Sequence, residues 1–479
     1  MRVLLLALAL VAFSAPAAWA RPSAAEPRPV RLIFGGDVML GRGVARADPS
    51  QLFAGIRGTL AAADYAVANL ESPLTTRKHL HGPYALEAPP SSARLLREAG
   101  LDAVGLANNH AGDAGPGTVP DTARAVSAAG VLVLGAGPNA AAAYAPRVVR
   151  VGGIRIALLD IDATRAGPPA GAHSWGIASW NEALARGAVL QARREADVVV
   201  VGLHSGTEYL TTTDPYTWQL AQQLARWGAD IVWAAHPHVV QPVRTIHNGS
   251  RTTVVATSLG NLVFDQHQTG TRQGALLEVL AGKGGVRAYR VGAATAYPPV
   301  RFLHWQLPRG DAVAVARGWW QIVRPVQPVV PQRAPSLSRF PGTVLAASVG
   351  DAEASGTRQL VVAFRRPYRP TNISAYVPRS ALVDRHGLTA HVGVYRLGDL
   401  APLWVAGTLL RPVSAVAACR GAVAVTYTEL NSPRVVGTGA WLWSGFGFSS
   451  LPMLPGLGTP ACANVDGVLD PVVLGRSKR

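Results

Sequence analysis

Short apolar runs alternate with amphipathic stretches along roughly the first 300 residues of the chain. The apolar runs span residues 30–34, 65–68, 101–106, 131–134, 154–159, 198–203, 231–234 and 253–256. Helix-like patterns separate several of them, at residues 91–99, 119–128, 181–196 and 216–227. Buried strands that alternate with amphipathic helices are typical of a sheet covered by helices. The pattern therefore predicts an α/β layered domain over residues 28–308.

The pattern changes at a proline-rich stretch, residues 323–341. Short β-like runs follow with little helical periodicity, which predicts a linker at 309–343 and a smaller all-β domain at 344–479. Residues 348–364 and 463–474 weakly resemble each other and degenerate propeller repeats of the FG-GAP type, without most of the acidic calcium ligands. A full propeller has at least about four four-stranded blades, so we expect only a small β-domain.

Polar residues follow six of the predicted strands, in each case just past the strand's end. Taken singly, each has an ordinary alternative as a helix cap, a turn residue or a surface histidine. The carboxyl ends of parallel strands, however, meet at one rim of a sheet, and ligands bind at that rim. Carboxylates, imidazoles and amide oxygens are metal ligands, so the set predicts a metal site there. Its members are Asp37, Asn69, Glu71, Asn108, Asn109, His110, His204, His236, His238 and Asn261.

Six sequence blocks surround these residues and read, in order, GGDVMLGR, NLES, ANNHAGDAG, HSGTEY, AHPHVVQP and SLGNLVFDQ. As an ordered set they resemble the signature blocks of the CapA family, the poly-γ-glutamate capsule proteins of the calcineurin-like metallophosphatase superfamily. The resemblance covers residues 30–268 and leaves the C-terminal β region uncovered. It implies a calcineurin-like metallophosphoesterase fold that binds two divalent metal ions, with Mn, Zn and Fe as the candidates.

The resemblance also implies a role for individual residues. Asp37 and His238 would hold the first metal, and Glu71 would bridge both metals. The ligands Asn109, His204 and His236 would hold the second metal. His110 would be the general acid that protonates the leaving group. Arg42, just past the first block, is either a clamp for a phosphate or carboxylate oxygen or an ordinary surface arginine.

Two positions depart from the superfamily pattern. Met39 stands two residues after Asp37, where classical phosphoesterases carry a metal-binding histidine, and a thioether is a poor ligand for Mn²⁺, Mg²⁺ or Zn²⁺. Glu71 replaces the usual bridging aspartate. Both features resemble the CapA branch, so we expect one metal to be held firmly and the other weakly.

The N-terminus predicts export. Arg2, an apolar run over residues 3–12 and the small residues Ala18 and Ala20 form the pattern of a cleaved signal peptide at 1–20. The alternative, an uncleaved anchor, is disfavoured because the run is shorter than the ~20 apolar residues that a membrane span needs. Without a cysteine near the cleavage site, a lipoprotein anchor is excluded. We expect a secreted or cell-surface protein.

Cysteine and charge fit that location. Cys419 and Cys462 are the only cysteines, and in an oxidising compartment they predict one disulfide, with a zinc site as a weaker alternative. The formal net charge is +17, yet only three of the 45 basic residues are lysines, which reflects a GC-rich genome as much as a binding surface. If the charge has a function, an anionic polymer or the cell envelope is the expected partner, and nucleic acid is not.

Three functional hypotheses remain open at this point. The first is a metal-dependent hydrolase acting on a phosphoester or on an anionic polymer such as poly-γ-glutamate. The second is a non-catalytic accessory protein that works with capsule-synthesis machinery to hold or export the polymer. The third adds a glycan-binding role for the β region, whose aromatic residues either stack on sugars or pack in its core: Trp404, Trp441, Trp443 and Phe446.

Overall fold

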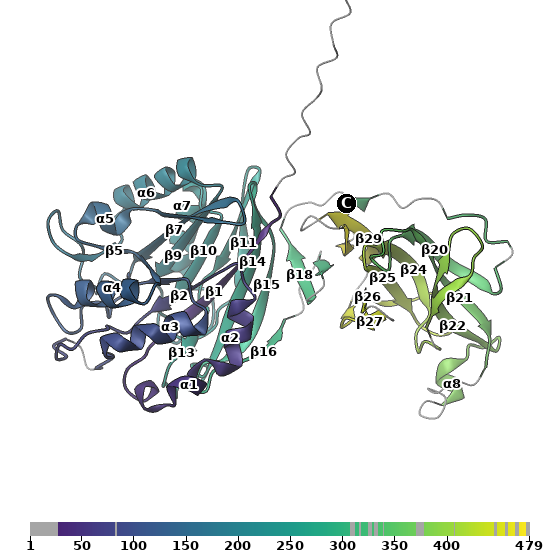
Figure 1. Ribbon diagram of the computed structural model, residues 1–479, viewed down its shortest axis with the longest axis horizontal. Coiled ribbons are helices and arrows are strands. Elements are labelled where there is room, and N and C mark those ends of the chain that lie inside the picture. The colour runs from purple at the N-terminus through teal and green to yellow at the C-terminus, as the bar shows by residue number, and fades with distance from the viewer. Residues whose placement is uncertain are drawn as a thin grey trace, which may run out of the picture.

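The protein is described by a computed structural model, which gives residues 27–81, 84–306, 312–315, 318–323, 328–329, 334–338, 340–369, 378–406, 408–444, 448–455, 458–464 and 469–475. The predicted signal peptide lies outside the described residues. Two sheets pack face to face in the N-terminal half, with helices on their outer surfaces, and a β region follows (Figure 1). The predicted fold class, an α/β layered domain followed by an all-β part, is confirmed.

The larger sheet has 13 strands in the order β19-β29-β30-β17-β18-β15-β14-β1-β2-β3-β4, with β13 beside β1 and β16 beside β15. Strands β1 to β4 run parallel, so their carboxyl ends share one edge. The strand bounds are β1 Val30–Val38, β2 Tyr65–Leu70, β3 Ala103–Gly105, β4 Leu132–Leu134, β13 Asn261–Val263, β14 Gln273–Gly282, β15 Gly285–Thr295, β16 Arg301–Trp305, β17 Ala312–Val315, β18 Gly318–Ile322, β19 Pro328–Val329, β29 Gly458–Asn464 and β30 Leu469–Gly475.

The second sheet has six strands in the order β11-β12-β10-β9-β7-β6. Its four central strands are parallel and buried on both faces, which is why they read as near-continuous apolar runs. Phe34 of the first sheet and Trp233 of the second meet between the sheets, with ring centroids 6.1 Å apart. The bounds are β6 Arg147–Val151, β7 Ile154–Asp162, β9 Val198–His204, β10 Ile231–Ala235, β11 Val243–Asn248 and β12 Arg251–Ala256; β5 Ala136–Gly137 pairs separately with β8 Gly176–Ile177.

Helices cover the outer faces of both sheets (Figure 1). Helix α7 shows how the sequence sets its ends: Asp214 caps the first turn by accepting from the N–H groups of Tyr216 and Thr217, and Gly228 ends the helix at φ +116°. Its apolar face packs on β10 and β12. The helices of this domain are α1 Pro49–Leu52, α2 Ala54–Ala61, α3 Ala93–Ala99, α4 Thr118–Ala128, α5 Ala140–Tyr144, α6 Glu182–Glu195 and α7 Pro215–Trp227, whereas α8 Arg379–Leu382 lies in the C-terminal region (Figure 1).

The C-terminal region contains two antiparallel sheets that share a core. Trp404 and Trp441 pack edge to face within that core, and Trp441 donates to the Tyr427 hydroxyl, so these two tryptophans have structural partners. Phe446 lies outside the described residues. The strands are β20 Thr343–Gly350, β21 Gln359–Pro367, β22 Leu388–Arg396 and β23 Pro402–Val405 in one sheet, and β24 Val413–Cys419, β25 Ala422–Thr428, β26 Val435–Trp443, β27 Phe448–Ser450 and β28 Leu454–Pro455 in the other.

The two regions are joined by strands rather than by an extended chain alone. The described part of the interval 309–343 contains β17, β18 and β19, and β18 pairs with β15 of the α/β domain. The C-terminal hairpin β29–β30 pairs with β19 and β17 and so belongs to the 13-stranded sheet. The expected disulfide between Cys419 and Cys462 is present and links β24 to β29, with their Cα atoms 5.5 Å apart.

Candidate metal centre

Every predicted ligand lies at the carboxyl end of a parallel strand. Asp37 is near the end of β1, Glu71 directly follows β2, His204 ends β9, and His236 and His238 follow β10. The face-to-face packing of the two sheets brings these strand ends to one rim. Asp37 and Glu71 have no exposed surface, and His204, His236 and His238 are at most 9% exposed. The rim is therefore a buried polar cluster within an apolar surrounding.

The local sequence shapes this rim closely. A Cβ atom at Gly36 would lie 1.7 Å from the carbonyl oxygen of Gly260, so only glycine lets β1 approach this segment. Asp37 then donates its backbone N–H to that carbonyl at 3.0 Å. His236 and His238 have φ angles of +101° and +58°, which are costly for residues with a side chain and are typical of functional sites.

The candidate ligands form two groups that share one carboxylate. Glu71, His204 and His236 place one ligand atom each within 4.8 Å of one another, and Asp37, Glu71 and His238 do the same. Asn109 joins the first group through its Oδ1 atom, 2.8 Å from Nε2 of His204. The structure thus brings together all six residues proposed as ligands, with Glu71 between the two groups.

The polar atoms of this cluster fit divalent cations. Within the described part of the chain, neither carboxylate oxygen of Glu71 nor the Nδ1 atom of His236 takes part in a hydrogen bond, although all three are buried. A buried carboxylate that accepts no hydrogen bond is costly, and a bound cation would offset that cost. Burial together with the nearby imidazoles of His204 and His238 lowers the pKa of His236 to about 2, so its imidazole is neutral.

The pKa of His238 shifts in the opposite direction, because two carboxylates lie close to its ring. Burial alone would lower its pKa, but the carboxylates of Glu71 and Asp37 raise it to about 9. Burial would likewise raise the pKa of Asp37, yet His238, His204 and Asn69 together lower it. Oxygen and imidazole donors around two buried carboxylates are a ligand set for Mn²⁺, Zn²⁺ or Fe²⁺.

His110 lies at the edge of the cluster. Its Nδ1 is 2.7 Å from Oδ2 of Asp113, and its Nε2 is 3.7 Å from Oε1 of Glu71. Burial would lower the pKa of His110, but Asp113 and Glu71 raise it. The aspartate fixes the orientation of the ring, so that Nε2 faces the candidate metal ligands.

The structure shows the contacts of Arg42 and Met39, which the sequence alone did not predict. Arg42 forms an ion pair with Asp265 and lies over the ring of Phe264 at 5.5 Å, so its guanidinium is already engaged by the chain. Phe264 in turn contacts the ring of His238 at 5.0 Å. The Met39 side chain is fully buried, and its sulfur accepts the N–H of Gly41 at 3.1 Å, which is a structural role.

Sequence reasoning assigned no role to several residues that hold the ligands in place. Asn69 donates to Oδ1 of Asp37 at 2.8 Å, and Asn108 donates to the carbonyl of Leu70 at 2.9 Å. Asn261 contacts Nδ1 of His238 through its Oδ1 at 3.0 Å. The three asparagines were part of the polar clusters, but only the folded chain shows which ligand each one contacts. For Asp113 the available signal was its i,i+3 spacing from His110.

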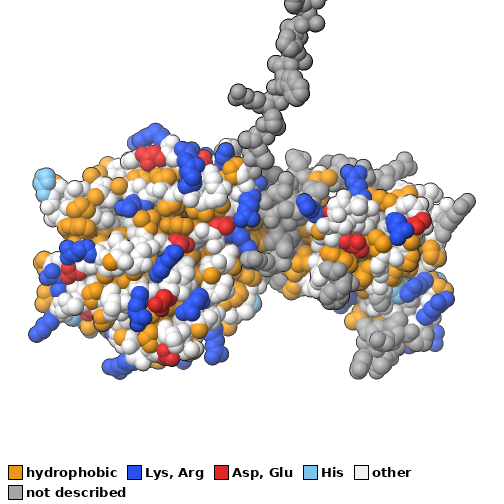
Figure 2. Space-filling model, in the orientation of Figure 1, with side chains coloured by type: hydrophobic (Ala, Val, Ile, Leu, Met, Phe, Trp, Pro, Cys, Tyr) orange, Lys and Arg blue, Asp and Glu red, His pale blue; other side chains and the backbone are white. Residues whose placement is uncertain are grey.

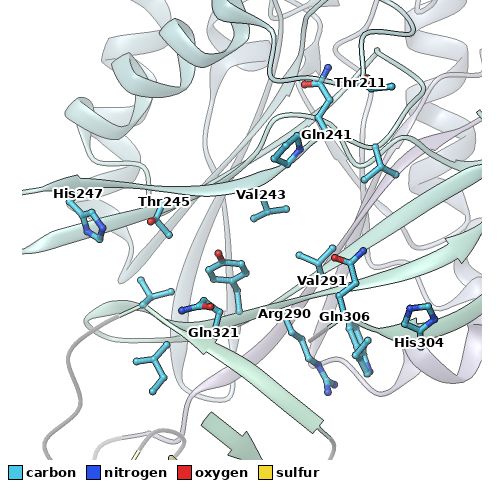
Figure 3. A pocket seen from close by; sticks show the side chains of 16 residues that line it. Thr211, Gln241, Val243, Thr245, His247, Arg290, Val291, His304, Gln306 and Gln321 are labelled. Atoms are coloured by element: carbon cyan, nitrogen blue, oxygen red, sulfur yellow. The ribbon is translucent and has the colours of Figure 1, made fainter. Parts of the chain in front are cut away.

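A large cleft lies elsewhere, between β11 and strands β15, β16 and β18 (Figure 3). Its volume is about 1190 Å³, and none of the candidate ligands lines it. Thr245 and His247 of β11 face Gln321 and Gln306 across the cleft (Figure 3). Its sixteen lining residues include no aspartate or glutamate.

Comparison with known proteins places this site in a family. The sequence profile described as bacterial capsule synthesis protein PGA_cap matches residues 31–266. The PGA biosynthesis protein CapA of Bacillus subtilis (strain 168) is 31% identical over 271 residues, which is 54% of this chain and 69% of that protein. The chain belongs to this family. It is a family involved in poly-γ-glutamate capsule biosynthesis.

Other similar proteins also cover about half of this chain. The capsule biosynthesis protein CapA of Bacillus anthracis is 32% identical over 261 residues, covering 51% of this chain and 62% of that protein. Among solved structures, a hypothetical protein from Thermus thermophilus gives a TM-score of 0.38 at 19% identity, covering 56% of this chain and 99% of that one. A 5′-nucleotidase precursor from the same organism gives 0.37 at 16% identity, covering 56% and 54%.

The family match ends before the β region. Residues 340–475, including both antiparallel sheets, lie beyond the matched residues 31–266. None of the helices in the described ranges combines the length and apolar character that crossing a membrane requires.

Proposed function

We propose that this chain is an exported, metal-dependent hydrolase of the capsule-synthesis family, which cleaves a phosphoester or an anionic polymer such as poly-γ-glutamate at the cell envelope. The observation that carries the proposal is the pair of buried ligand groups that share Glu71. In this assignment Asp37 and His238 hold one cation, and Asn109, His204 and His236 hold the other. Relatives named for capsule biosynthesis support the polymer as a substrate.

The residues of the chain divide the work as follows. Two bound divalent cations would supply the Lewis acidity that activates water and neutralises charge on the substrate. Glu71 keeps the two ligand groups together because it belongs to both. His110 carries a proton on Nε2 at the edge of the site, where it is given to the leaving group, while Asp113 stabilises the ring through Nδ1. Arg42 takes part only if the substrate displaces Asp265 from its guanidinium.

The deciding experiment is metal content by elemental mass spectrometry on residues 21–479, together with hydrolysis of phosphoesters and γ-linked glutamyl peptides. We expect about two transition-metal equivalents per chain, in line with two-metal hydrolases. The double variant Asn109→Ala/His236→Ala is expected to lose metal and hydrolysis together. His173→Ala, an exposed histidine that belongs to neither ligand group and does not line the cleft described above, is the matched histidine control and should retain both. Full hydrolysis by the double variant would refute this mechanism.

A second function is favoured by the cleft between β11 and β15. Because no carboxylate lines it, the cleft does not repel an anionic polymer, and an accessory protein would hold the polymer there. This proposal expects poly-γ-glutamate binding that persists in chelator and falls in the variant Thr245→Glu/His247→Glu. Binding that disappears with the metal would assign the polymer to the metal centre instead.

Export is the third element of the proposal. The disulfide Cys419–Cys462 supports it, because such bonds persist in oxidising compartments outside the cytosol. Expression of the full chain with mass analysis of the mature N-terminus should give a chain that begins at Arg21. An intact N-terminus in the membrane fraction would show that residues 1–20 act as an anchor.

A further inference from the structure

One buried carboxylate outside the ligand set lies between the two sheets of the α/β domain. Asp160 belongs to β7 of the six-stranded sheet and is 3% exposed. Its Oδ2 atom accepts the backbone N–H of Ala107 at 2.8 Å, and Ala107 follows β3 of the 13-stranded sheet. This hydrogen bond therefore crosses from one sheet to the other at the rim that carries the candidate ligands.

The surrounding chain makes room for this side chain at three glycines. A Cβ atom at Gly105 would lie 2.5 Å from Oδ2 of Asp160, and one at Gly202 would lie 2.3 Å from Oδ1. Gly135, at φ +72°, would place its Cβ 2.9 Å from the Cβ of Asp160. A buried carboxylate is costly, and burial raises the pKa of Asp160 to about 7. The segments that contain these three glycines thus leave space for the Asp160 carboxyl group, although burying that group is itself unfavourable for folding.

The contact falls at the start of a functional loop. Residues 107–110 carry Asn109 and His110, and β3, which precedes them, has only three residues, Ala103–Gly105. A strand this short does little to fix where the loop lies relative to the opposite sheet. Asp160, by contrast, pairs with Gly202 on β9, two residues before His204. Asp160 therefore connects the loop that carries Asn109 to the strand next to β9, which carries His204.

We propose that Asp160 is a positioning residue, whose carboxyl group holds the loop 107–110 against the six-stranded sheet so that Asn109 and His204 meet at one metal. The tether is a property of the folded chain by itself. Its consequence for metal binding rests on the proposed function. The 2.8 Å contact between Asn109 and His204 is the geometry that this tether maintains.

The test compares Asp160→Ala with Asp160→Asn, whose amide oxygen accepts the same N–H. The matched control is Asp102→Ala, because Asp102 also accepts a backbone N–H, that of Ala66 at 2.9 Å, but at the opposite end of β3. The first measurement is amide hydrogen exchange in metal-free protein. We expect residues 107–111 to exchange about tenfold faster in Asp160→Ala, and at the wild-type rate in Asp160→Asn and Asp102→Ala.

The second measurement is the affinity for each metal equivalent, titrated with Mn²⁺ or Zn²⁺. In Asp160→Ala the equivalent held by Asn109, His204 and His236 should weaken about tenfold or more, as expected when a ligand's supporting partner is lost, and the other should change little. If Asp160→Ala does not fold, Gly105→Ala replaces it, since it crowds the carboxyl group without removing it and should loosen the same loop.

Unchanged exchange of residues 107–111 in folded Asp160→Ala would overturn the proposal, as would Asp160→Asn exchanging as fast as Asp160→Ala. A wild-type chain that binds no metal would refute the proposed function, while the exchange measurement would still decide on the tether.

Discussion

The metal centre of the α/β domain and the β region treat buried charge in opposite ways. In the β region the buried carboxylate of Asp384 accepts from the N–H groups of His386 and Leu388 and pairs with Arg365. In the α/β domain Glu71 is fully buried but accepts no hydrogen bond from the described residues. The first carboxylate is satisfied by its own fold, and the second is left available for a ligand.

The difference follows from topology. Parallel strands direct their carboxyl ends to one edge, so side chains from β1, β2, β9 and β10 converge there. Antiparallel strands alternate in direction, and their polar ends are distributed over both edges of the sheet. A cluster of unsatisfied ligands is therefore expected in the first region and not in the second. Among the described residues, both candidate metal groups lie in the α/β domain.

The largest expected effect comes from removing the shared carboxylate. Glu71→Gln should reduce bound metal from about two equivalents to less than one and hydrolysis by roughly 10⁴-fold or more, because both cations lose a ligand. Elemental analysis and kinetics on the same preparation measure both. The matched change in the β region, Asp384→Asn, should leave metal content untouched. Two retained equivalents in Glu71→Gln would remove the contrast between the regions.

The next effect separates proton transfer from metal binding. His110→Asn should lower kcat by about 10²–10⁴-fold while both metals stay bound, as expected for loss of a general acid. Substrates with a leaving group that needs no proton should be much less affected. A variant that loses its metal instead would show His110 to be a ligand.

The disulfide provides a test in the β region. Cys419→Ser/Cys462→Ser opens a link between residues 43 apart in sequence, which should lower stability by up to about 4 kcal/mol, mainly by enlarging the unfolded ensemble. Denaturant unfolding with exchange measurements on β24 and β29 would locate the loss. Metal content of the α/β domain should be unaffected, and a concurrent loss of metal would mean that the two regions are energetically coupled.

The smallest effect is a difference in pH dependence. The pKa of Asp160 is raised by burial to about 7, so the folded state binds an extra proton and its stability falls as pH rises from about 4 to 7. Burial would also raise the pKa of Asp384, but backbone N–H groups and Arg365 lower it, so its stabilisation is lost as pH falls below about 4. Asp160→Asn should flatten the first slope and Asp384→Asn the second, as measured by urea unfolding between pH 3 and 8. Identical slopes in both variants would contradict this assignment.

The distribution of surface charge does not distinguish the α/β domain from the β region. Lysine and arginine side chains are scattered over the visible face of both regions, between hydrophobic and uncharged side chains (Figure 2). The net charge of +17 is therefore a weaker guide to a polymer site on this face than the carboxylate-free cleft of Figure 3.

Much of this architecture was predictable from local sequence. Apolar runs marked the strands, and helix α6 forms at Glu182–Glu195, within the predicted residues 181–196. The candidate ligands were also identifiable, because each polar cluster directly follows a strand. These strands, helices and candidate ligands could be predicted because each depends on a pattern of residues that are neighbours in the sequence.

The sequence by itself thus determined eight strands and four helices of the α/β domain, the disulfide partners and the candidate residues of a metal site. Only the tertiary structure decided that Glu71 belongs to both ligand groups, that Asp265 engages Arg42 and that Asp160 reaches Ala107. It also decided that the hairpin β29–β30 completes a sheet begun at Val30. The Asp160–Ala107 and Arg42–Asp265 contacts join residues 53 and 223 positions apart, so they depend on how the sheets pack and not on any local pattern.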